Sequence, residues 1–183
     1  MQVQTCSQSN FVYTVNSITY PNGDVYEGEL LNGERNGKGT MIYANGIIYD
    51  GYWGCGRISG KGKMTYTNGI VYEGFWRNYE FSGKGRMTFP DGSSYDGDWL
   101  NGKKHGKGKY RKSYGDTYIG EFVEGEITGK GIMCYQCGGV YKGNWINGQK
   151  TGKGVYTDAD GHAQVQKWKN TWGGIWTNVM DNK

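Results

Sequence analysis

The sequence predicts an all-β protein in which consecutive β-hairpins form one antiparallel sheet. Three observations lead to this fold class: a regular 23-residue repeat, an alternation of residue types within each repeat, and glycines where a hairpin must turn. The composition agrees, because 34 of the 183 residues are glycine and only two are proline. Such a composition excludes collagen and proline-rich linkers.

The repeat is carried by aromatic residues and glycines. A tyrosine recurs every 23 residues, at Tyr26, Tyr49, Tyr72, Tyr95, Tyr118 and Tyr141. A glycine stands two positions after each tyrosine, and a large apolar residue stands two positions further, at Leu30, Trp53, Trp76, Trp99, Phe122 and Trp145. A G-K-G triplet recurs six times, and Trp168 marks a degraded seventh copy. The chain is therefore one array of similar units.

Each unit is expected to form two strands. Residues 72–76 place tyrosine, glycine and tryptophan on one face, and residues 83–89 place two glycines, Met87 and Phe89 on one face. A short turn, which contains glycine in most copies, joins the two strands, and a second glycine turns the chain into the next unit. At about 4.8 Å per strand, six to seven hairpins predict a sheet about 60–70 Å long.

The glycines are expected to have a packing role in this sheet. A single layer has no second layer to cover it, so the buried surface must come from within one face. A strand glycine leaves a shallow trough in which a neighbouring ring can lie. The tyrosines and tryptophans are therefore predicted to cover the glycines, with methionines such as Met41 and Met133 filling gaps.

Three segments are predicted along the chain. Residues 1–19 form an N-terminal capping segment, residues 20–163 form six repeats, and residues 164–183 form a degenerate seventh repeat with a C-terminal cap. The cap contains Trp168, Trp172 and Trp176, and we expect it to protect the sheet edge or to mediate self-association through it.

The pattern Y-x-G-x-W-x-x-G-x-x-x-G-x-G, repeated every 23 residues, resembles the MORN repeat (membrane occupation and recognition nexus) over nearly the whole chain. The resemblance implies an elongated, twisted, single-layer sheet without catalytic activity. Proteins with this repeat include junctophilins, radial spoke head components, basal-complex proteins of protists and plant phosphatidylinositol-phosphate kinases. Leu30 and Phe122 depart from the pattern at the tryptophan position, as Tyr79 does at the turn glycine.

The chain contains short motifs that resemble a phosphate-binding loop and a zinc site, but neither has the residues and spacing that such a site requires. Residues 148–154 read GQKTGKG, which is one residue short of a phosphate-binding loop and precedes a strand where that loop requires a helix. Cys134 and Cys137 form a C-x-x-C pair, and His105 and His162 are the two histidines. Because His162 lies one repeat onward, about 10 Å away by strand spacing, at best three of the four ligands of a structural zinc site come together. No nucleophile–base arrangement is recognisable. We therefore expect no enzyme activity, no metal and no cofactor.

Aromatic and aliphatic residues interrupt the polar outward face in the second and third repeats. Ile48, Tyr52, Val71 and Phe75 lie there, and Tyr79 and Phe81 follow in the adjoining turn. Rings on an otherwise polar face indicate a docking patch for a partner protein. Local packing of a turn or terminal segment is the alternative.

Two further groups are candidate binding sites. The fourth repeat concentrates basic residues that suit an acidic partner or anionic lipid: Lys103, Lys104, Lys107, Lys109, Arg111 and Lys112. A solvated face neutralised by Asp96 and Asp98 is the alternative. The aromatic face itself is predicted to form a shallow groove lined by Tyr49, Trp53, Tyr72, Trp76, Tyr95 and Trp99. The resemblance to the MORN repeat implies that this groove receives a helix or strand of a partner.

The net charge of +4 does not require nucleic acid, and the sequence shows neither a signal peptide nor a membrane-spanning run. We therefore expect a cytoplasmic, non-catalytic scaffold or adaptor. From the family likeness we expect a cytoskeletal assembly, either ciliary or axonemal as in radial spokes, or cortical. The alternatives are a peripheral membrane module that binds anionic phospholipids and a regulatory subunit of an enzyme.

Overall fold

A two-residue turn joins the two strands of every repeat. The computed structural model describes residues 13–171 and 175–178. In the first repeat, Asn32 and Gly33 both have positive φ, 51° and 82°. Two successive residues with positive φ define the type I′ turn, whose twist matches that of the flanking strands. Tyr79 follows this pattern with φ 67° where the other repeats carry glycine.

The chain divides into two compact units, residues 1–85 and 86–183, with the division inside β7. The strands of unit 1 are β1 (Tyr13–Thr19), β2 (Val25–Leu31), β3 (Glu34–Ile42), β4 (Ile48–Gly54), β5 (Arg57–Thr65), β6 (Val71–Arg77) and the start of β7 (Glu80–Thr88). Those of unit 2 are β8 (Ser94–Leu100), β9 (Lys103–Arg111), β10 (Thr117–Val123), β11 (Glu126–Cys134), β12 (Val140–Ile146), β13 (Gln149–Thr157), β14 (Ala163–Thr171) and β15 (Ile175–Asn178).

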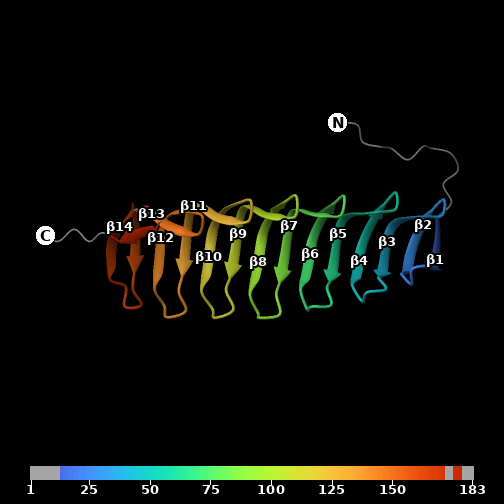
Figure 1. Cartoon of the computed structure of the whole chain (residues 1–183), viewed down its shortest axis with the longest axis horizontal. Coiled ribbons are helices and arrows are strands. Elements are labelled where there is room, and N and C mark those ends of the chain that lie inside the picture. The colour runs from blue at the N-terminus through green and yellow to red at the C-terminus, as the bar shows by residue number, and fades with distance from the viewer. Residues whose placement is uncertain (1–12, 172–174, 179–183) are drawn as a thin grey trace, which may run out of the picture. The chain divides into compact units, whose positions relative to one another are not determined.

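Within each unit, neighbours in sequence are neighbours in the sheet. Strands β1 to β6 pair in order and antiparallel, and so do strands β8 to β15 (Figure 1). The predicted all-β fold of consecutive antiparallel hairpins is confirmed. Among the described residues there is no helix long and apolar enough to cross a bilayer.

Each repeat tyrosine lies along its own hairpin, over a pair of facing glycines. Gly28 and Gly39 are paired across β2 and β3, and a Cβ added to Gly39 would overlap the ring of Tyr26. The Tyr26 hydroxyl then donates a hydrogen bond to the backbone oxygen of Glu29 at 2.8 Å. The predicted packing of rings into glycine troughs is confirmed, and it explains the spacing of tyrosine and glycine in the repeat.

A β-bulge supplies the carbonyl that the tyrosine uses. In the first repeat the register changes from Gly28↔Gly39 to Leu30↔Arg35, so Glu29 faces three residues of β3. Gly37, the first glycine of G-K-G, has φ 79° there. The Glu29 carboxylate accepts a hydrogen bond from the Lys38 backbone N–H at 3.1 Å, and Asp98 does the same for Lys107 at 3.0 Å. The carboxylate therefore caps the bulge.

The tyrosine and tryptophan rings form a ladder of edge-to-face contacts in each unit. In unit 1, Trp53 contacts both Tyr26 and Tyr49, with ring centroids 5.5 and 5.3 Å apart. In unit 2, Phe122 contacts both Tyr95 and Tyr118, at 4.9 and 5.3 Å. Such contacts add to the area that the rings bury. Each ring thereby joins one repeat to the next.

Strands also form at both ends of the array. Strand β1 pairs with β2 and places Ile18 opposite Tyr26, and β14 and β15 extend unit 2 beyond the sixth repeat. Trp168 packs near Tyr141, with ring centroids 6.4 Å apart. Residues 1–12 and Trp172 lie outside the described residues, so the predicted terminal caps stay predictions.

Candidate functional site

The two faces of each sheet differ in composition. One face, the core face, carries the buried tyrosines and tryptophans, and the other is called the outward face here. Because cross-strand neighbours lie about 4.8 Å apart, outward residues form rows perpendicular to the strands. These rows, and not single strands, are the surfaces that a partner meets.

Unit 1 carries a row in which lysines and rings alternate. Lys38 lies opposite Tyr52, and Lys61 lies opposite Phe75. The Lys38 ammonium is 5.6 Å from the centroid of the Tyr52 ring, and the Lys61 ammonium is 5.4 Å from that of Phe75. The Tyr52 and Phe75 residues are 43% and 41% exposed. We call Lys38, Tyr52, Lys61 and Phe75 the lysine–aromatic row.

The rings of this row occupy positions that have another role elsewhere. The equivalent residues in the first and fourth repeats are Glu29 and Asp98, whose carboxylates cap the bulge. Tyr52 and Phe75 contact the bulge glycines of their repeats but offer no carboxylate: a Cβ at Gly60 would lie 3.5 Å from Tyr52. These two repeats have exchanged a capping group for an exposed ring, which the fold does not require.

The other aliphatic residues of the predicted patch form a separate row. Ile48 lies opposite Ile42, and both are exposed, whereas Val71 is half-buried. The charged residues Asp50 and Lys63, which face each other, lie between this row and the lysine–aromatic row. The structure therefore brings Ile48, Tyr52, Val71 and Phe75 to one face, but in two rows that charges separate.

The position predicted for Phe81 is corrected. The prediction put Phe81 in the turn, next to the outward patch, whereas it lies in β7 on the core face. Its ring stacks on Tyr72 with centroids 3.9 Å apart, and it contacts Trp76 at 4.8 Å. The strand begins at Glu80, directly after the two-residue turn, so the alternation reaches Phe81. Phe81 is therefore a packing residue.

Tyr79 lies in the turn, as expected, and half of it is exposed. Its hydroxyl donates a hydrogen bond to the backbone oxygen of Gly56 in the preceding turn at 3.3 Å. The Arg35 guanidinium donates to the same oxygen at 2.8 Å. Tyr79 thus links successive turns, and any binding role would be shared with this structural one.

The six rings of the predicted aromatic groove lie in the core. Tyr49, Trp53, Tyr72, Trp76, Tyr95 and Trp99 are each at most 5% exposed. Burial raises the pKa of the Tyr26 hydroxyl on the same face to about 12, despite the nearby Arg35 charge. These rings therefore leave almost no surface for a partner to contact, and their binding role stays a prediction.

Cations on the core face were not expected from the sequence. Arg35 lies 4.5 Å from the Trp53 ring centroid, and Lys150 lies 4.3 Å from that of Tyr141 and 4.9 Å from that of Trp168. Burial lowers the pKa of Lys150. Such cation–π contacts let a charged residue cover a ring at the edge of the core. Arg35 and Lys150 are each the second residue of the second strand of their hairpin, and the alternation along that strand puts this residue on the core face.

The basic residues of the fourth repeat do not gather into one patch. Lys103 pairs with Glu124 at 2.6 Å, and Lys112 lies over Tyr114. Lys104 lies on the core face, 4.3 Å from the Tyr110 ring centroid, and its pKa is lowered by burial. By alternation, the outward face retains Lys107, Lys109 and Arg111.

Among the described residues, Cys134, Cys137, His105 and His162 do not form a group of close metal ligands. Cys134 ends β11 half-buried, and Cys137 is exposed in the following turn. In the described chain, the one group of three close metal-ligand types is Asp158, Asp160 and His162, whose ligand atoms lie within 4.8 Å of one another in an exposed turn. His162 contacts Asp158 at 3.3 Å. Exposed acidic groups of this kind are common in turns and do not define a metal site.

Unit 2 carries an outward row that sequence reasoning missed. Ile119 faces Ile132, Lys142 faces both Ile132 and Val155, and Val155 faces Val165. Ile119, Val155 and Val165 are 45%, 41% and 67% exposed. We call Ile119, Ile132, Val155 and Val165 the aliphatic row. The sequence does contain a signal for this row. The repeat position that holds an acidic residue in the first four repeats (Glu27, Asp50, Glu73 and Asp96) holds Ile119, Lys142 and Val165 in the next three.

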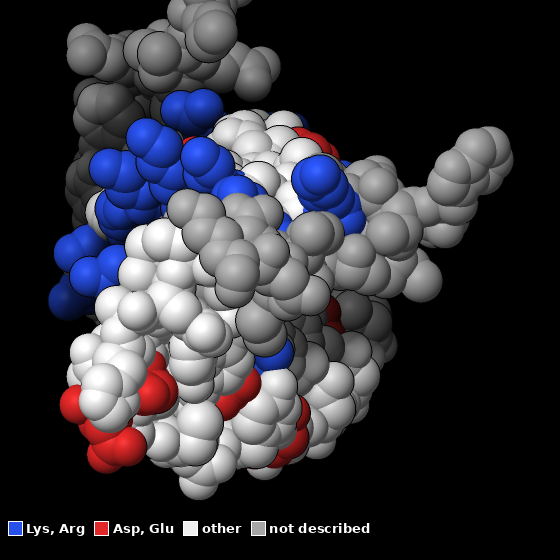
Figure 2. Space-filling view, turned by 90° about the vertical axis from the view of Figure 1, so that its left-hand side faces the viewer, with Lys and Arg blue, Asp and Glu red and all other residues white. Residues whose placement is uncertain are grey.

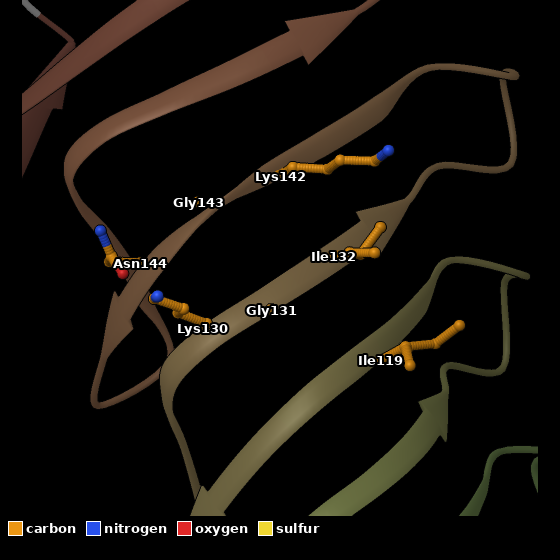
Figure 3. Close-up of a pocket in the computed structure, with 7 residues that line it drawn as sticks. All are labelled: Ile119, Lys130, Gly131, Ile132, Lys142, Gly143 and Asn144. Atoms are coloured by element: carbon orange, nitrogen blue, oxygen red, sulfur yellow. The ribbon is translucent and has the colours of Figure 1, made fainter.

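A shallow hollow lies beside this row. It is lined by Ile119, Ile132, the glycine pair Gly131 and Gly143, Lys130, Lys142 and Asn144 (Figure 3). In Figure 3 the two lysines extend from neighbouring strands on either side of the paired glycines. Figure 2 views the molecule from the β14 side, with Lys and Arg in blue and Asp and Glu in red.

Comparisons with known proteins agree with the repeat. The family model described as MORN repeat matches residues 26–48, 49–71, 72–94, 95–117, 118–139 and 141–163. No curated protein matches the chain in a sequence comparison.

Among solved structures, the chain is similar to the TCP domain of Drosophila melanogaster SAS-4 (dCPAP), solved in complex with a proline-rich motif of Ana2 (dSTIL). The identity is 16%, the TM-score is 0.55, and the alignment covers 90% of this chain and 97% of that one. For the wild-type TCP10 domain of Danio rerio CPAP the identity is 11% and the TM-score 0.49, with 94% and 95% covered. At 16% identity the similarity to the SAS-4 domain concerns the fold alone.

Proposed function

Because the chain belongs to the MORN-repeat family, we propose that it is a non-catalytic protein-interaction scaffold whose unit 1 binds a partner through the lysine–aromatic row. Repeats 2 and 3 hold Tyr52 and Phe75 on the outward face, each with a lysine over its ring. Exposed aromatic residues with adjacent cations are typical of the side chains that dominate protein interfaces.

One observation carries this proposal. Tyr52 and Phe75 stand where Glu29 and Asp98 cap their bulges, so the rings replace a group that stabilises the fold. An exposed ring in that place gains little from the sheet itself, because 43% and 41% of the two residues remain exposed. A partner that covers the rings would supply the missing burial, at about 25 cal/mol per Å² of apolar area.

The proposed setting is a cytoskeletal assembly, either ciliary or axonemal, as in radial spokes, or cortical. The setting rests on the family likeness. The SAS-4 domain in complex with a proline-rich motif supports the view that a sheet of this fold can receive a peptide. Aromatic surfaces commonly bind proline-rich segments, because such segments lose little conformational freedom on binding.

The experiment compares partner capture by the parent and by Tyr52→Glu, Phe75→Glu and the double variant. Native assemblies are cross-linked to the protein in the source cells and identified by mass spectrometry. We expect the variants to lose the partner that cross-links to unit 1 while the thermal transition is retained. Tyr114→Glu is the matched control, because Tyr114 is also an exposed ring with a lysine over it, but lies in unit 2.

Partner capture by the double variant at the level of the parent would contradict the proposal. Unfolding of both single variants would also contradict it, because the two rings would then be packing residues. Co-sedimentation with phosphatidylinositol-phosphate vesicles, abolished by Lys107→Glu and Lys109→Glu, would favour the peripheral membrane alternative. An enzyme that co-purifies in fixed ratio would favour the regulatory-subunit alternative.

A further inference from the structure

We propose that the outward face of unit 2, between β10 and β14, binds an acidic amphipathic helix of a partner protein that lies across the strands. The inference rests on the proposed scaffold role but uses a different surface. It follows from the apolar row, the lysines beside it and the pairing of the strands beneath.

The aliphatic row supplies the apolar contact. Its residues come from β10, β11, β13 and β14, with Lys142 of β12 in the middle. Four strand spacings of about 4.8 Å make the row about 19 Å long. A helix advances about 5.4 Å per turn, so apolar side chains one turn apart fall close to successive strands. About 13 residues of helix would cover the row.

The fold does not need these aliphatic side chains. In unit 1 the equivalent row consists of Glu27, Thr40, Asp50, Lys63 and Glu73, and the strands pair in the same register. A charged row therefore suffices for the sheet. The replacement of that row by residues as exposed as Val165 indicates a partner that covers them.

The lysines decide the charge of the partner. Lys130 faces Asn144, which stands where Glu121 stands one repeat earlier, and Lys142 stands where earlier repeats carry Asp or Glu. Within residues 13–171, neither lysine has a carboxylate at ion-pair distance. Both line the hollow over Gly131 and Gly143, together with Ile119 and Ile132 (Figure 3).

Lys153 continues the same line of lysines one repeat further, at the position equivalent to Lys130. This line lies two residues along the strands from the aliphatic row, about 7 Å away. A helix that places leucines on the aliphatic row therefore brings one flank over the lysines, because its diameter with side chains is about 10–12 Å. Glutamate or aspartate on that flank would meet Lys130 and Lys153, and an acidic residue between the leucines would meet Lys142, which lies within the aliphatic row.

Strand pairing favours a helix over an added strand. Strands β10 to β13 each have partners on both sides, so this region offers no free edge for a peptide to extend the sheet. A helix packed on the face of a sheet is the usual way in which such a surface is covered.

The test uses a synthetic labelled helical peptide of about 18 residues, with leucine on one face and glutamate along one flank. A matched peptide has lysine in place of every glutamate. Fluorescence anisotropy with the full chain should show the acidic peptide binding at least about tenfold more tightly than the basic one. Ile119→Glu and Lys142→Glu should each weaken binding by about tenfold or more.

Ile119→Glu recreates the pattern of unit 1, because residue 119 faces Lys109, so the variant is expected to fold. The matched control is Ile42→Glu, an exposed aliphatic residue on the outward face of unit 1, which should leave peptide binding unchanged. Circular dichroism and a thermal transition check both folds.

Equal affinity for the two peptides, or binding that neither variant in unit 2 weakens, would overturn the inference. So would binding to phosphatidylserine vesicles that the acidic peptide does not displace, because a membrane would then be the ligand. These results would leave the proposed function standing, because that proposal is tested by partner capture through Tyr52 and Phe75.

Discussion

In unit 1 the middle row of the outward face carries Glu27, Asp50, Lys63 and Glu73. In unit 2 the same row begins with Asp96 and Lys109 and then becomes aliphatic at Ile119, Ile132, Val155 and Val165, with Lys142 among them. The core faces do not differ in this way. Tyr49 and Tyr118 lie over paired glycines in both units, and both donate a hydrogen bond to a bulge carbonyl. The comparison shows that the core face specifies the hairpins and leaves the outward face free to vary.

The largest expected effect comes from filling a glycine trough, in either unit. A Cβ at Gly74 would lie 2.6 Å from the Tyr72 hydroxyl and 2.5 Å from the Gly85 Cα, so Gly74→Val must displace the ring or the backbone. We expect Gly74→Val in unit 1 and Gly131→Val in unit 2 each to cost about 3 kcal/mol. Urea unfolding measures this, and a midpoint equal to the parent's would refute the packing scheme.

Alkaline pH should destabilise the core that both units share. Burial raises the pKa of Tyr26 and of Tyr118 to about 12. In the unfolded chain these hydroxyls ionise near pH 10, so the unfolded state releases protons that the folded state keeps. Stability is therefore unaffected below about pH 10 and falls as the pH rises toward 12. We expect the urea midpoint to fall between about pH 10 and pH 12 while the tyrosinate absorbance of the unfolded chain rises, and a flat midpoint would show that the tyrosines are accessible.

The carboxylates that cap the bulges are expected to change the free energy of unfolding by a smaller amount. Glu29→Ala leaves the Lys38 N–H without its 3.1 Å acceptor and should cost about 1 kcal/mol. The reciprocal change, Phe75→Glu, supplies a cap that the third repeat lacks and should stabilise unit 1 by about 0.5 kcal/mol. Thermal melts of both variants test the pair. Destabilisation by Phe75→Glu would mean that the ring packs, and would remove the argument for a binding role.

The smallest effect is expected where the two outward faces are interchanged. Ile119→Glu converts one position of the aliphatic row to its unit 1 equivalent, opposite Lys109. Such a surface change should alter the free energy of unfolding by less than about 0.5 kcal/mol. A loss of unfolding free energy well above that value, seen as a lowered urea midpoint, would show that the aliphatic row stabilises the fold. The outward face of unit 2 would then not be free to vary in the way that we infer from the comparison of the units.

The candidate surfaces were less predictable than the fold. Tyr52 and Phe75 were found because they break a polar pattern, and the structure places both on the outward face. Phe81 was misplaced because the second strand begins at Glu80, directly after a two-residue turn, and not at the G-K-G triplet. Extending the alternation back to that turn puts Phe81 on the core face, and it puts Lys104, for which no face was predicted, there too. The aliphatic row was missed because its members are 10 to 23 residues apart in sequence and meet only through strand pairing.

The sequence by itself determined the 23-residue hairpin and the burial of tyrosine and tryptophan over glycine, because these follow from the repeat and its alternation. The tertiary structure set the length of the turn at two residues. The tertiary structure decided the bulge. At the bulge, Glu29 of β2 faces three residues of β3, two more than in a regular pairing. Because two is an even number, the inward and outward alternation of β3 continues unchanged past the bulge. The bulge therefore leaves no mark on the alternation of the sequence. The tertiary structure also decided which outward residues become neighbours, since pairing across strands, and not order along the chain, joins Tyr52 to Lys38 and Ile119 to Ile132.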